Sequence, residues 1–216
     1  MIDGAPASVA VFGGTFDPIH NGHLRSALEL AERLELGEVR MMPCASPPHR
    51  GTPAGSADHR AAMLELAVAG EPRLSCDRRE LDREGLSYTI DSLVSLRGEL
   101  GEQCSISLIM GCDAVLDLAS WHRWDELLDW AHVVLIARPG WQFPEQGPVA
   151  RWLQAHRCDS EQQLKASSAG CVMVEELRPL PISASEIRDI VRTGRSARYL
   201  LPASVLDYIF NHSLYL

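Results

Sequence analysis

Short apolar runs alternate along the chain with longer segments in which apolar residues recur at helical spacing. The apolar runs at 8–12, 39–42, 74–76, 105–110, 133–137 and 171–175 predict strands. Helices are expected at 24–34, 58–69, 89–100 and 124–130, after Ser183, and at 203–211. This alternation is typical of βα units around a parallel sheet, and short apolar strands indicate a sheet that is covered on both faces. We therefore predict an α/β fold that ends in helices.

Composition narrows the class of protein. With 216 residues, 46% of them hydrophobic and 23% charged, we expect one domain, residues 1–216, with an α/β core at 1–180 and a helical part at 181–216. A net charge of −9 argues against a nucleic-acid-binding face, and the six cysteines form no C-x-x-C pair of a zinc ribbon. The apolar runs are far shorter than the ~20 residues that cross a bilayer, and the first residues lack a signal-peptide pattern. These features predict a cytoplasmic protein with no membrane partner.

Local signals set expectations for single elements. Gly37 is placed to stop the first helix. Ser183, with Glu186 three residues later, has the pattern of a capping box, and Ile182 with Ile187 has that of a hydrophobic staple. Residues 139–147 are expected to form a loop because Gly, Pro and Gln dominate there, and we assign no chemistry to residues 139–170.

The most informative stretch is GGTFDPIHNGHL at residues 13–24. It lies between the first strand and the first helix, where open α/β sheets bind ligands. Gly13 and Gly14 let the backbone approach a ligand closely, and the N–H groups at the helix start form an anion site. The stretch is neither the G-x-G-x-x-G fingerprint nor a P-loop. It predicts a phosphate cradle of a different kind.

Two histidines give this cradle its chemistry. If the helix begins near Asn21, the spacing of His20 and His23 points both rings at the same place, and Gly22 between them leaves room for a nucleotide. Capping or surface roles are the alternatives for each ring. Two histidines without Cys, Asp or Glu at i+4 make a poor zinc site, so we assign no metal ligand.

The stretch resembles the signature of the H-x-G-H nucleotidylyltransferases, and further blocks resemble their bacterial nicotinate-nucleotide adenylyltransferase branch. These blocks are PPHR at 47–50, SYTIDSL at 87–93, Gly111-x-Asp113, Trp121 with Trp124, and ISASEIR at 182–188. They follow the family's order from residue 11 to 188. The resemblance implies a Rossmann-like doubly wound parallel sheet with a small C-terminal helical part. It also implies an enzyme of NAD biosynthesis that transfers the adenylyl group of ATP to nicotinate mononucleotide, giving nicotinate adenine dinucleotide and pyrophosphate.

Adenylyl transfer requires positioning and positive charge. The attacking phosphate is already mostly anionic at pH 7, so no general base or covalent nucleophile is required. We expect His20 and His23 to donate to the α-phosphate and bridging oxygens, and Arg188 to meet the β- and γ-phosphates. Mg²⁺ is expected to enter with ATP, held mainly by phosphate oxygens. The ATP-binding residues are expected to be Gly13, Gly14, Thr15, Phe16, His20, Gly22, His23, Gly111, Asp113, Ser183, Ser185 and Arg188.

The acceptor needs an aromatic platform and a phosphate clamp. Trp121 is expected to stack on the cationic pyridinium ring. By the resemblance, Thr89 and backbone N–H groups near Trp121 bind the nicotinate carboxylate, with Tyr88 in the same segment. The resemblance also brings His49, Arg50 and Arg138 to the mononucleotide phosphate. Cys44 and Ala45 depart from the family pattern, which often has an Asn there, and His122 stands where a Tyr is common.

Two other functions stay open at this point. A sister transferase would use phosphopantetheine or glycerol phosphate as the acceptor, and a catalytically silent protein would bind the nucleotide without turnover. The blocks at 47–50 and 87–89 favour the pyridine nucleotide. The presence of His20, His23 and Arg188 together favours catalysis, because a protein that only binds the nucleotide does not need donors for the transition state.

Overall fold

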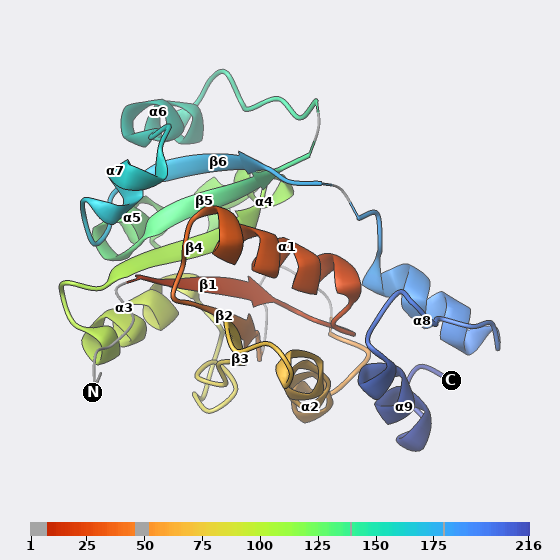
Figure 1. The fold of residues 1–216 in the computed structure, drawn as a ribbon. Helices are drawn as coiled ribbons and strands as arrows, with labels where there is room; N and C mark the ends of the chain where they lie inside the picture. Colours follow the sequence, from red (N-terminus) through yellow and green to blue (C-terminus); the bar gives the residue numbers. More distant parts are fainter. Residues whose placement is uncertain (1–7, 46–51, 139, 179) are drawn as a thin grey trace.

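A six-stranded parallel sheet runs through the centre of the molecule (Figure 1). The structure is a computed structural model and describes residues 8–45, 52–138, 140–178 and 180–216. The strands lie in the order β3-β2-β1-β4-β5-β6, and every neighbouring pair is parallel. This order confirms the predicted doubly wound α/β sheet. The strands are β1 (Ser8–Gly14), β2 (Glu38–Pro43), β3 (Leu74–Cys76), β4 (Ser105–Gly111), β5 (His132–Ala137) and β6 (Val172–Glu176).

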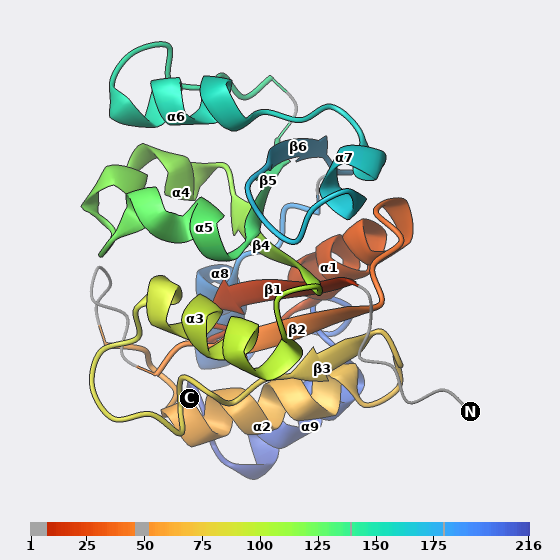
Figure 2. The ribbon, with the colours of Figure 1, turned by 90° about the vertical axis from the view of Figure 1, so that its left-hand side faces the viewer.

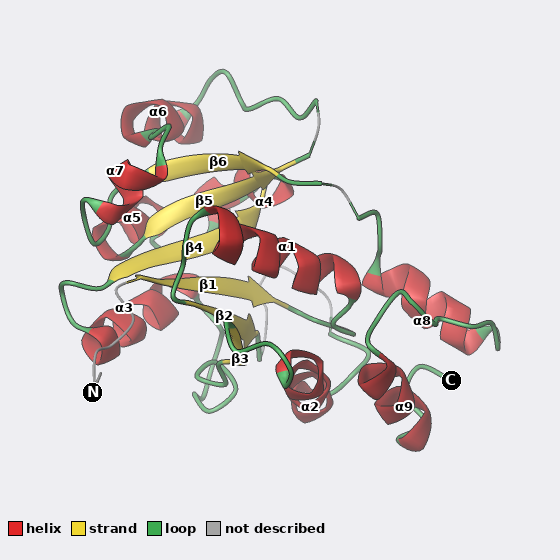
Figure 3. Cartoon of the chain, viewed as in Figure 1, coloured by secondary structure: helices red, strands yellow, loops and turns green. Residues whose placement is uncertain are grey.

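Helices cover both faces of the sheet (Figure 3). The core on one face takes side chains from α1, α2, α8 and α9, and the core on the other face takes them from α3, α4, α5 and α6. No helix in the described ranges is long and apolar enough to cross a membrane. The helices are α1 (Asn21–Arg33), α2 (Ala57–Val68), α3 (Thr89–Leu100), α4 (Asp113–Leu116), α5 (Leu127–Trp130), α6 (Pro148–His156), α7 (Glu161–Lys165), α8 (Ala184–Arg192) and α9 (Ala203–Asn211), with 3-10 turns η1 (Leu118–Ser120) and η2 (Trp124–Glu126).

The central strands are mostly apolar because successive side chains enter opposite cores. In β1, Ala10 faces the core of α1 and α2, whereas Val9 and Val11 face the core of α3 and α5. All three are at most 2% exposed. Burying a side chain of valine size stabilises the fold by about 1.5–3 kcal/mol, so the sheet is fixed from both sides.

The loops that follow the strands meet at one end of the sheet. The strand order changes direction between β1 and β4, where Phe12 pairs with Ile109, so the ends of these two strands lie side by side. Connections that leave β1 and β4 pass to opposite faces, and such a switch point opens a crevice beyond the strand ends. Figure 1 shows α8 and α9 beyond the arrowheads at this same end.

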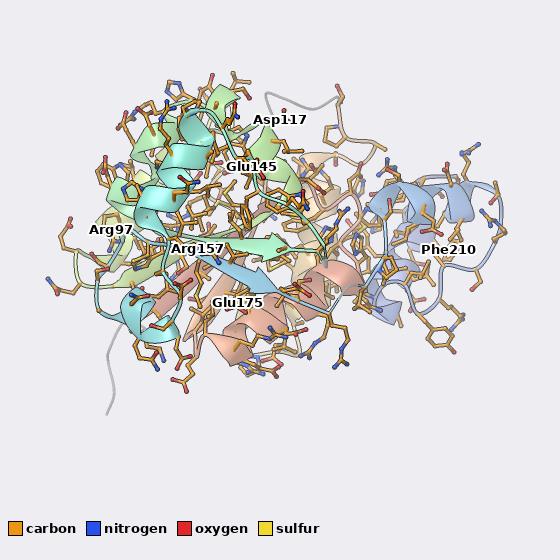
Figure 4. All side chains as sticks on the ribbon, turned by 90° about the horizontal axis from the view of Figure 1, so that it is seen from above. Arg97, Asp117, Glu145, Arg157, Glu175 and Phe210 are labelled. Atoms are coloured by element: carbon orange, nitrogen blue, oxygen red, sulfur yellow. The ribbon has the colours of Figure 1, made fainter. Side chains whose placement is uncertain are left out.

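The opposite end of the sheet is held by buried polar groups. Arg97 is 4% exposed and donates to four carbonyl oxygens, those of Gly101, Cys104, Trp130 and Ser168, at 2.6–2.9 Å. Figure 4 labels Arg97 at the end of the molecule opposite α9. Because every donated bond ends on the main chain, Arg97 joins three segments (101–104, Trp130 and Ser168) without needing a particular side chain in any of them.

His132 at the start of β5 is also fully buried at this end. Its Nδ1 accepts from the Cys171 N–H at 3.1 Å, and its Nε2 lies 3.0 Å from the Ser167 carbonyl oxygen. These partners require the proton on Nε2, and burial lowers the pKa of His132. The ring is therefore a neutral structural group with both nitrogens satisfied.

Several sequence expectations need correction. Gly37 does not stop α1, which ends at Arg33; Glu35 takes the left-handed turn with a φ of 48°. Ser183 is the N-cap of α8, but its side chain makes no capping hydrogen bond, so the predicted capping box is not formed. Residues 139–170 contain α6 and α7, which the sequence reading missed, and the helix expected at 124–130 is divided into η2 and α5. Figure 2 shows α6 as a separate layer beyond α4 and α5.

Candidate active site

His20 and His23 stack face to face where α1 begins. Their ring centroids are 3.7 Å apart, and the ring planes differ by 21°. Asn21 is the first residue of α1, and His20 is its N-cap in an extended conformation. The His20 carbonyl oxygen accepts from the N–H groups of His23 and Leu24 at 3.0 and 3.2 Å. The spacing therefore places both rings together, as the sequence predicts.

Burial controls the charge of this pair. His20 is 5% exposed, and the Nδ1 atoms of both rings are buried without a hydrogen-bond partner among the described residues. Desolvation lowers the pKa of His20 to about 4. Desolvation, and then the proximity of His20, lower the pKa of His23 to about 3. At pH 7 both imidazoles are neutral, and each carries one N–H that can be donated.

The glycines around the pair make room for rings. Phe16 has a left-handed φ of 50° and places its ring edge-on to His23 at 5.1 Å. A Cβ on Gly14 would lie 2.8 Å from the Phe16 ring, and a Cβ on Gly22 would lie 3.0 Å from His20 Nδ1. A Cβ on Gly13 would meet nothing within 4 Å. A side chain at Gly14 would thus require the Phe16 ring to move, and one at Gly22 would press on the His20 ring.

Arg188 reaches this loop from the other end of the chain. It is the fifth residue of α8, one turn in from the helix start. Its Nη1 donates to the Asp17 carbonyl oxygen at 2.6 Å, and its Nη2 donates to Ser185 Oγ at 3.3 Å. Asp17 is three residues before His20, so the guanidinium and the imidazole pair are attached to one short loop.

Two residues that the sequence reading missed secure the same loop. Arg60 is 1% exposed and donates to the carbonyl oxygens of Thr15, Gly55 and Ala45 at 2.7, 3.2 and 3.4 Å. Asn21 donates from its backbone and its side chain to the segment between α8 and α9, at Leu200 and Tyr199. No local pattern marks Arg60, and Asn21 lies in the stretch at 13–24 without a role that its spacing would indicate. Their partners are set only by the fold.

Asp113 and Arg138 meet at the ends of β4 and β5. Asp113 Oδ2 and Arg138 Nη2 are 2.8 Å apart, and both side chains are mostly exposed. Cys112, not Asp113, is the N-cap of α4, so the carboxylate is not used to cap that helix. An exposed pair of this kind contributes about 0–1 kcal/mol. Either side chain can therefore turn to a ligand at little cost.

The predicted acceptor segments also lie together. Tyr88 is the N-cap of α3, which begins at Thr89, and its ring packs against His122 at 4.5 Å. Trp121 precedes His122 and packs partly buried on the core of α3. The Ala45 N–H, after β2, donates to Ser87 Oγ at 3.0 Å. His49 and Arg50 lie outside the described residues.

Beneath this segment lies a buried carboxyl group that no sequence pattern singles out. Glu80 is 8% exposed, and Ser92 Oγ donates to its Oε1 at 2.8 Å. Burial raises the pKa of Glu80, and hydrogen bonds from Ser92 and Ser87 act in the opposite direction. Since Ser92 is in α3 and Ser87 precedes it, Glu80 helps to fix the start of α3 next to the loop after β2.

The sequence is similar to a known protein family and to full-length relatives. Residues 11–190 match the cytidylyltransferase-like family model. A chain from Cellvibrio japonicus, named "Probable nicotinate-nucleotide adenylyltransferase", is 48% identical over 96% of this chain and 98% of its own length. One from Marinomonas sp. with the same name is 42% identical over 97% of this chain and 95% of its own.

The fold has solved counterparts as well. The Plasmodium falciparum nicotinic acid mononucleotide adenylyltransferase complexed with NaAD superposes with a TM-score of 0.70 at 17% identity, over 96% of this chain and 97% of that one. At 17% identity this similarity supports the fold and nothing more. The identity to full-length relatives bears on the family: this chain belongs to the nicotinate-nucleotide adenylyltransferases, within the cytidylyltransferase-like proteins.

Proposed function

We propose that this protein transfers the adenylyl group of ATP to nicotinate mononucleotide, with His20, His23 and Arg188 as the catalytic residues. The observation that carries the proposal is the stacked imidazole pair, with His20 buried, at the switch point of the sheet, on the loop that also holds the Arg188 guanidinium. Family membership at 42–48% identity agrees with it.

The chemistry follows from what these groups can donate. A phosphate oxygen of the mononucleotide attacks the α-phosphorus of ATP, the new P–O bond forms, and the bond to the α–β bridging oxygen breaks to release pyrophosphate. The attacking oxygen is already deprotonated at pH 7, so the protein has no proton to remove. Its contribution is to align the two phosphates and to donate hydrogen bonds where negative charge accumulates.

The imidazole pair suits this role because it is neutral and enclosed. His20 and His23 are uncharged at pH 7, and no described residue fixes which nitrogen carries the proton. A phosphate oxygen in contact with the pair would therefore select the tautomer that donates to it. Arg188 carries a permanent charge, which suits the departing β- and γ-phosphates.

The remaining assignments complete the two halves of the site. Asp113 would accept from the ATP ribose, and Arg138 would approach the acceptor phosphate, each leaving the exposed ion pair that joins them. Trp121, Tyr88 and Thr89 border the place proposed for the pyridine ring. The cytoplasm remains the compartment that the sequence predicts.

Mg²⁺ would enter with ATP and take its ligands mainly from the phosphate oxygens. It would there neutralise phosphate charge, and binding of this kind does not need a set of ligands supplied entirely by the protein. Groups of three or more His, Cys, Asp or Glu side chains placed to hold a metal ion are not found in the described part of the chain.

The direct test measures pyrophosphate release from ATP and Mg²⁺ with a set of acceptors. Nicotinate mononucleotide should give rapid release and nicotinate adenine dinucleotide as product, whereas phosphopantetheine and glycerol phosphate should give none. Turnover with either of these instead would favour a sister transferase, and tight ATP binding without turnover would favour a silent binding protein. The ratio of kcat/KM for nicotinate and nicotinamide mononucleotide reports the preference for the acid.

A histidine variant tests the catalytic assignment. His20→Ala should leave ATP binding largely intact and lower kcat by orders of magnitude, because its donor acts mainly in the transition state. His156→Ala is a matched control, since that ring hydrogen-bonds only the Trp152 carbonyl oxygen of its own helix among the described residues. Equal kcat values for the two variants would refute the role of His20.

A further inference from the structure

Asp17 is a buried junction between four parts of the chain. It is 5% exposed, and its carboxylate accepts three hydrogen bonds. Oδ2 accepts from the Ala54 N–H at 2.8 Å, and Oδ1 accepts from the Gly55 N–H at 2.9 Å and from the Tyr215 hydroxyl at 2.7 Å. The Tyr215 bond spans 198 positions of sequence. Nothing in the proposed reaction so far uses this hydroxyl.

The segment after α9 is folded so as to deliver Tyr215 to Asp17. The helix ends at Asn211, and Ser213 and Tyr215 both take left-handed φ values, of 51° and 62°. Between them, the Leu214 N–H donates to the Ile209 carbonyl oxygen at 2.9 Å, and its side chain packs on the core. Figure 1 shows this end of the chain next to α8 and α9. Two unfavourable backbone conformations are therefore retained where the hydroxyl reaches the carboxylate.

Tyr215 is well suited to act as a permanent donor. Burial, and then the hydrogen bond to Asp17, raise the pKa of Tyr215, so its hydroxyl keeps the proton that it donates. On the other side of the junction, a Cβ added to Gly55 would lie 3.0 Å from the Tyr215 oxygen and 2.9 Å from Asp17 Oδ1. The Gly55 backbone thus closes the contact on this side.

Asp17 connects this contact to Arg188. The Asp17 carbonyl oxygen accepts from Arg188 Nη1 at 2.6 Å, while Asp17 Oδ2 is 3.6 Å from the same nitrogen. We propose that Tyr215 is a positioning residue for adenylyl transfer: by holding the Asp17 carboxylate, it keeps the Arg188 guanidinium on the main-chain oxygen and directed to the phosphates of ATP. This inference rests on the role of Arg188 in the proposed function.

The physical basis is a competition for the Asp17 charge. With the hydroxyl in place, one carboxylate oxygen has two donors and the other has one. Without it, each carboxylate oxygen keeps a single backbone N–H donor, and Oδ2, which lies 3.6 Å from Arg188 Nη1, can draw the guanidinium closer. A direct carboxylate–guanidinium pair would neutralise the charge that the β- and γ-phosphates require. Loss of the Tyr215 hydroxyl should therefore lower kcat/KM for ATP while the protein stays folded.

Tyr215→Phe tests the proposal, because it removes one oxygen and keeps the ring. We expect kcat/KM for ATP to fall about tenfold, as for a lost hydrogen bond to a charged group, while KM for nicotinate mononucleotide stays within about twofold. Tyr208→Phe is the matched control. It also removes a tyrosine hydroxyl that takes part in a hydrogen bond, here with His59, but Tyr208 does not hydrogen-bond Asp17 among the described residues. It should leave kcat/KM for ATP unchanged.

The Arg188→Ala background separates positioning from general stability. If Tyr215 acts through Arg188, Tyr215→Phe should change ATP binding and kcat/KM by less than about twofold once Arg188 is absent. The same tenfold loss in both backgrounds would overturn the proposal, as would an unchanged kcat/KM for ATP in Tyr215→Phe.

A second variant covers the case in which Tyr215→Phe does not fold. Gly55→Ala places a methyl group against the same hydrogen bond from the opposite side and should produce the same selective loss with ATP. A folded Gly55→Ala protein with unchanged kcat/KM for ATP would overturn the proposal. A wild-type protein without adenylyl transfer would instead refute the proposed function, so the two failures are distinguishable.

Discussion

Lowering the pH from 7 to 5 should destabilise the folded protein through His20 and His23. Burial lowers their pKa to about 4 and about 3, whereas a histidine in the unfolded chain titrates at about 6.5. At pH 5 the unfolded state therefore binds nearly one proton per ring that the folded state does not bind. Above about pH 6.5, the pKa of histidine in the unfolded chain, the rings do not reduce the free energy of unfolding. As the pH falls below that value, the free energy of unfolding decreases.

The size of the effect follows from the two pKa values. Each pH unit between the unfolded pKa and the working pH costs about 1.36 kcal/mol per ring. From about 6.5 down to pH 5 this amounts to about 2 kcal/mol for one ring and roughly 4 kcal/mol for the pair. Since a domain is stable by about 5–15 kcal/mol in total, a loss of this size is readily measured.

Urea unfolding at pH 7 and pH 5 is the appropriate assay, with the double variant His20→Gln, His23→Gln as the reference. His132 is also buried with a lowered pKa, but it is present in both proteins and its contribution cancels. The wild type should lose roughly 4 kcal/mol more than the variant between the two pH values. If both proteins lose the same free energy of unfolding, the rings are not held neutral by burial, and the electrostatic account of the site is wrong.

Three further predictions test the surroundings of the pair. Gly22→Ala should lower kcat at least tenfold in steady-state assays, because the new Cβ would lie 3.0 Å from His20 Nδ1 and displace that ring; an unchanged kcat would contradict this packing. Arg60→Met should reduce the free energy of unfolding in urea by about 3 kcal/mol or more, since three carbonyl oxygens lose their donor; a loss below about 1 kcal/mol would show that water replaces the guanidinium. Asp113→Ala should change stability by less than about 1 kcal/mol, because its pair with Arg138 is exposed, yet lower kcat/KM for ATP tenfold; equal kinetics would remove Asp113 from the site.

The parts of the fold that the sequence predicts well are those in which several local signals agree. The helix at 89–100 and the helix at 203–211 have the predicted bounds, and the strand at 74–76 does too. In α6, Pro148 is well placed for a first turn, and Val149, Trp152 and Leu153 are buried at helical spacing. That pattern is only nine residues long and follows a Gly- and Pro-rich segment, so the segment's composition concealed it.

The same distinction applies to the site. His20 and His23 could be placed together because one turn of helix determines their relation, and the local sequence contains that turn. Arg60, Asn21 and Tyr215 could not be found in this way. Their partners lie up to 198 positions away, so each contact depends on the complete sheet and on how α2 and α9 pack. Sequence patterns record local geometry, and long-range anchors require the assembled chain.

Arg97, at the end of the sheet away from the histidines, bears on how this protein can diverge in evolution. Its four acceptors are all main-chain oxygens, which every amino acid supplies. The residues that carry those oxygens can therefore change without weakening the anchor, whereas a lysine at 97 has a single nitrogen and could not reach all four oxygens. Substitutions accumulated among related chains should accordingly spread over these neighbours and avoid the arginine itself.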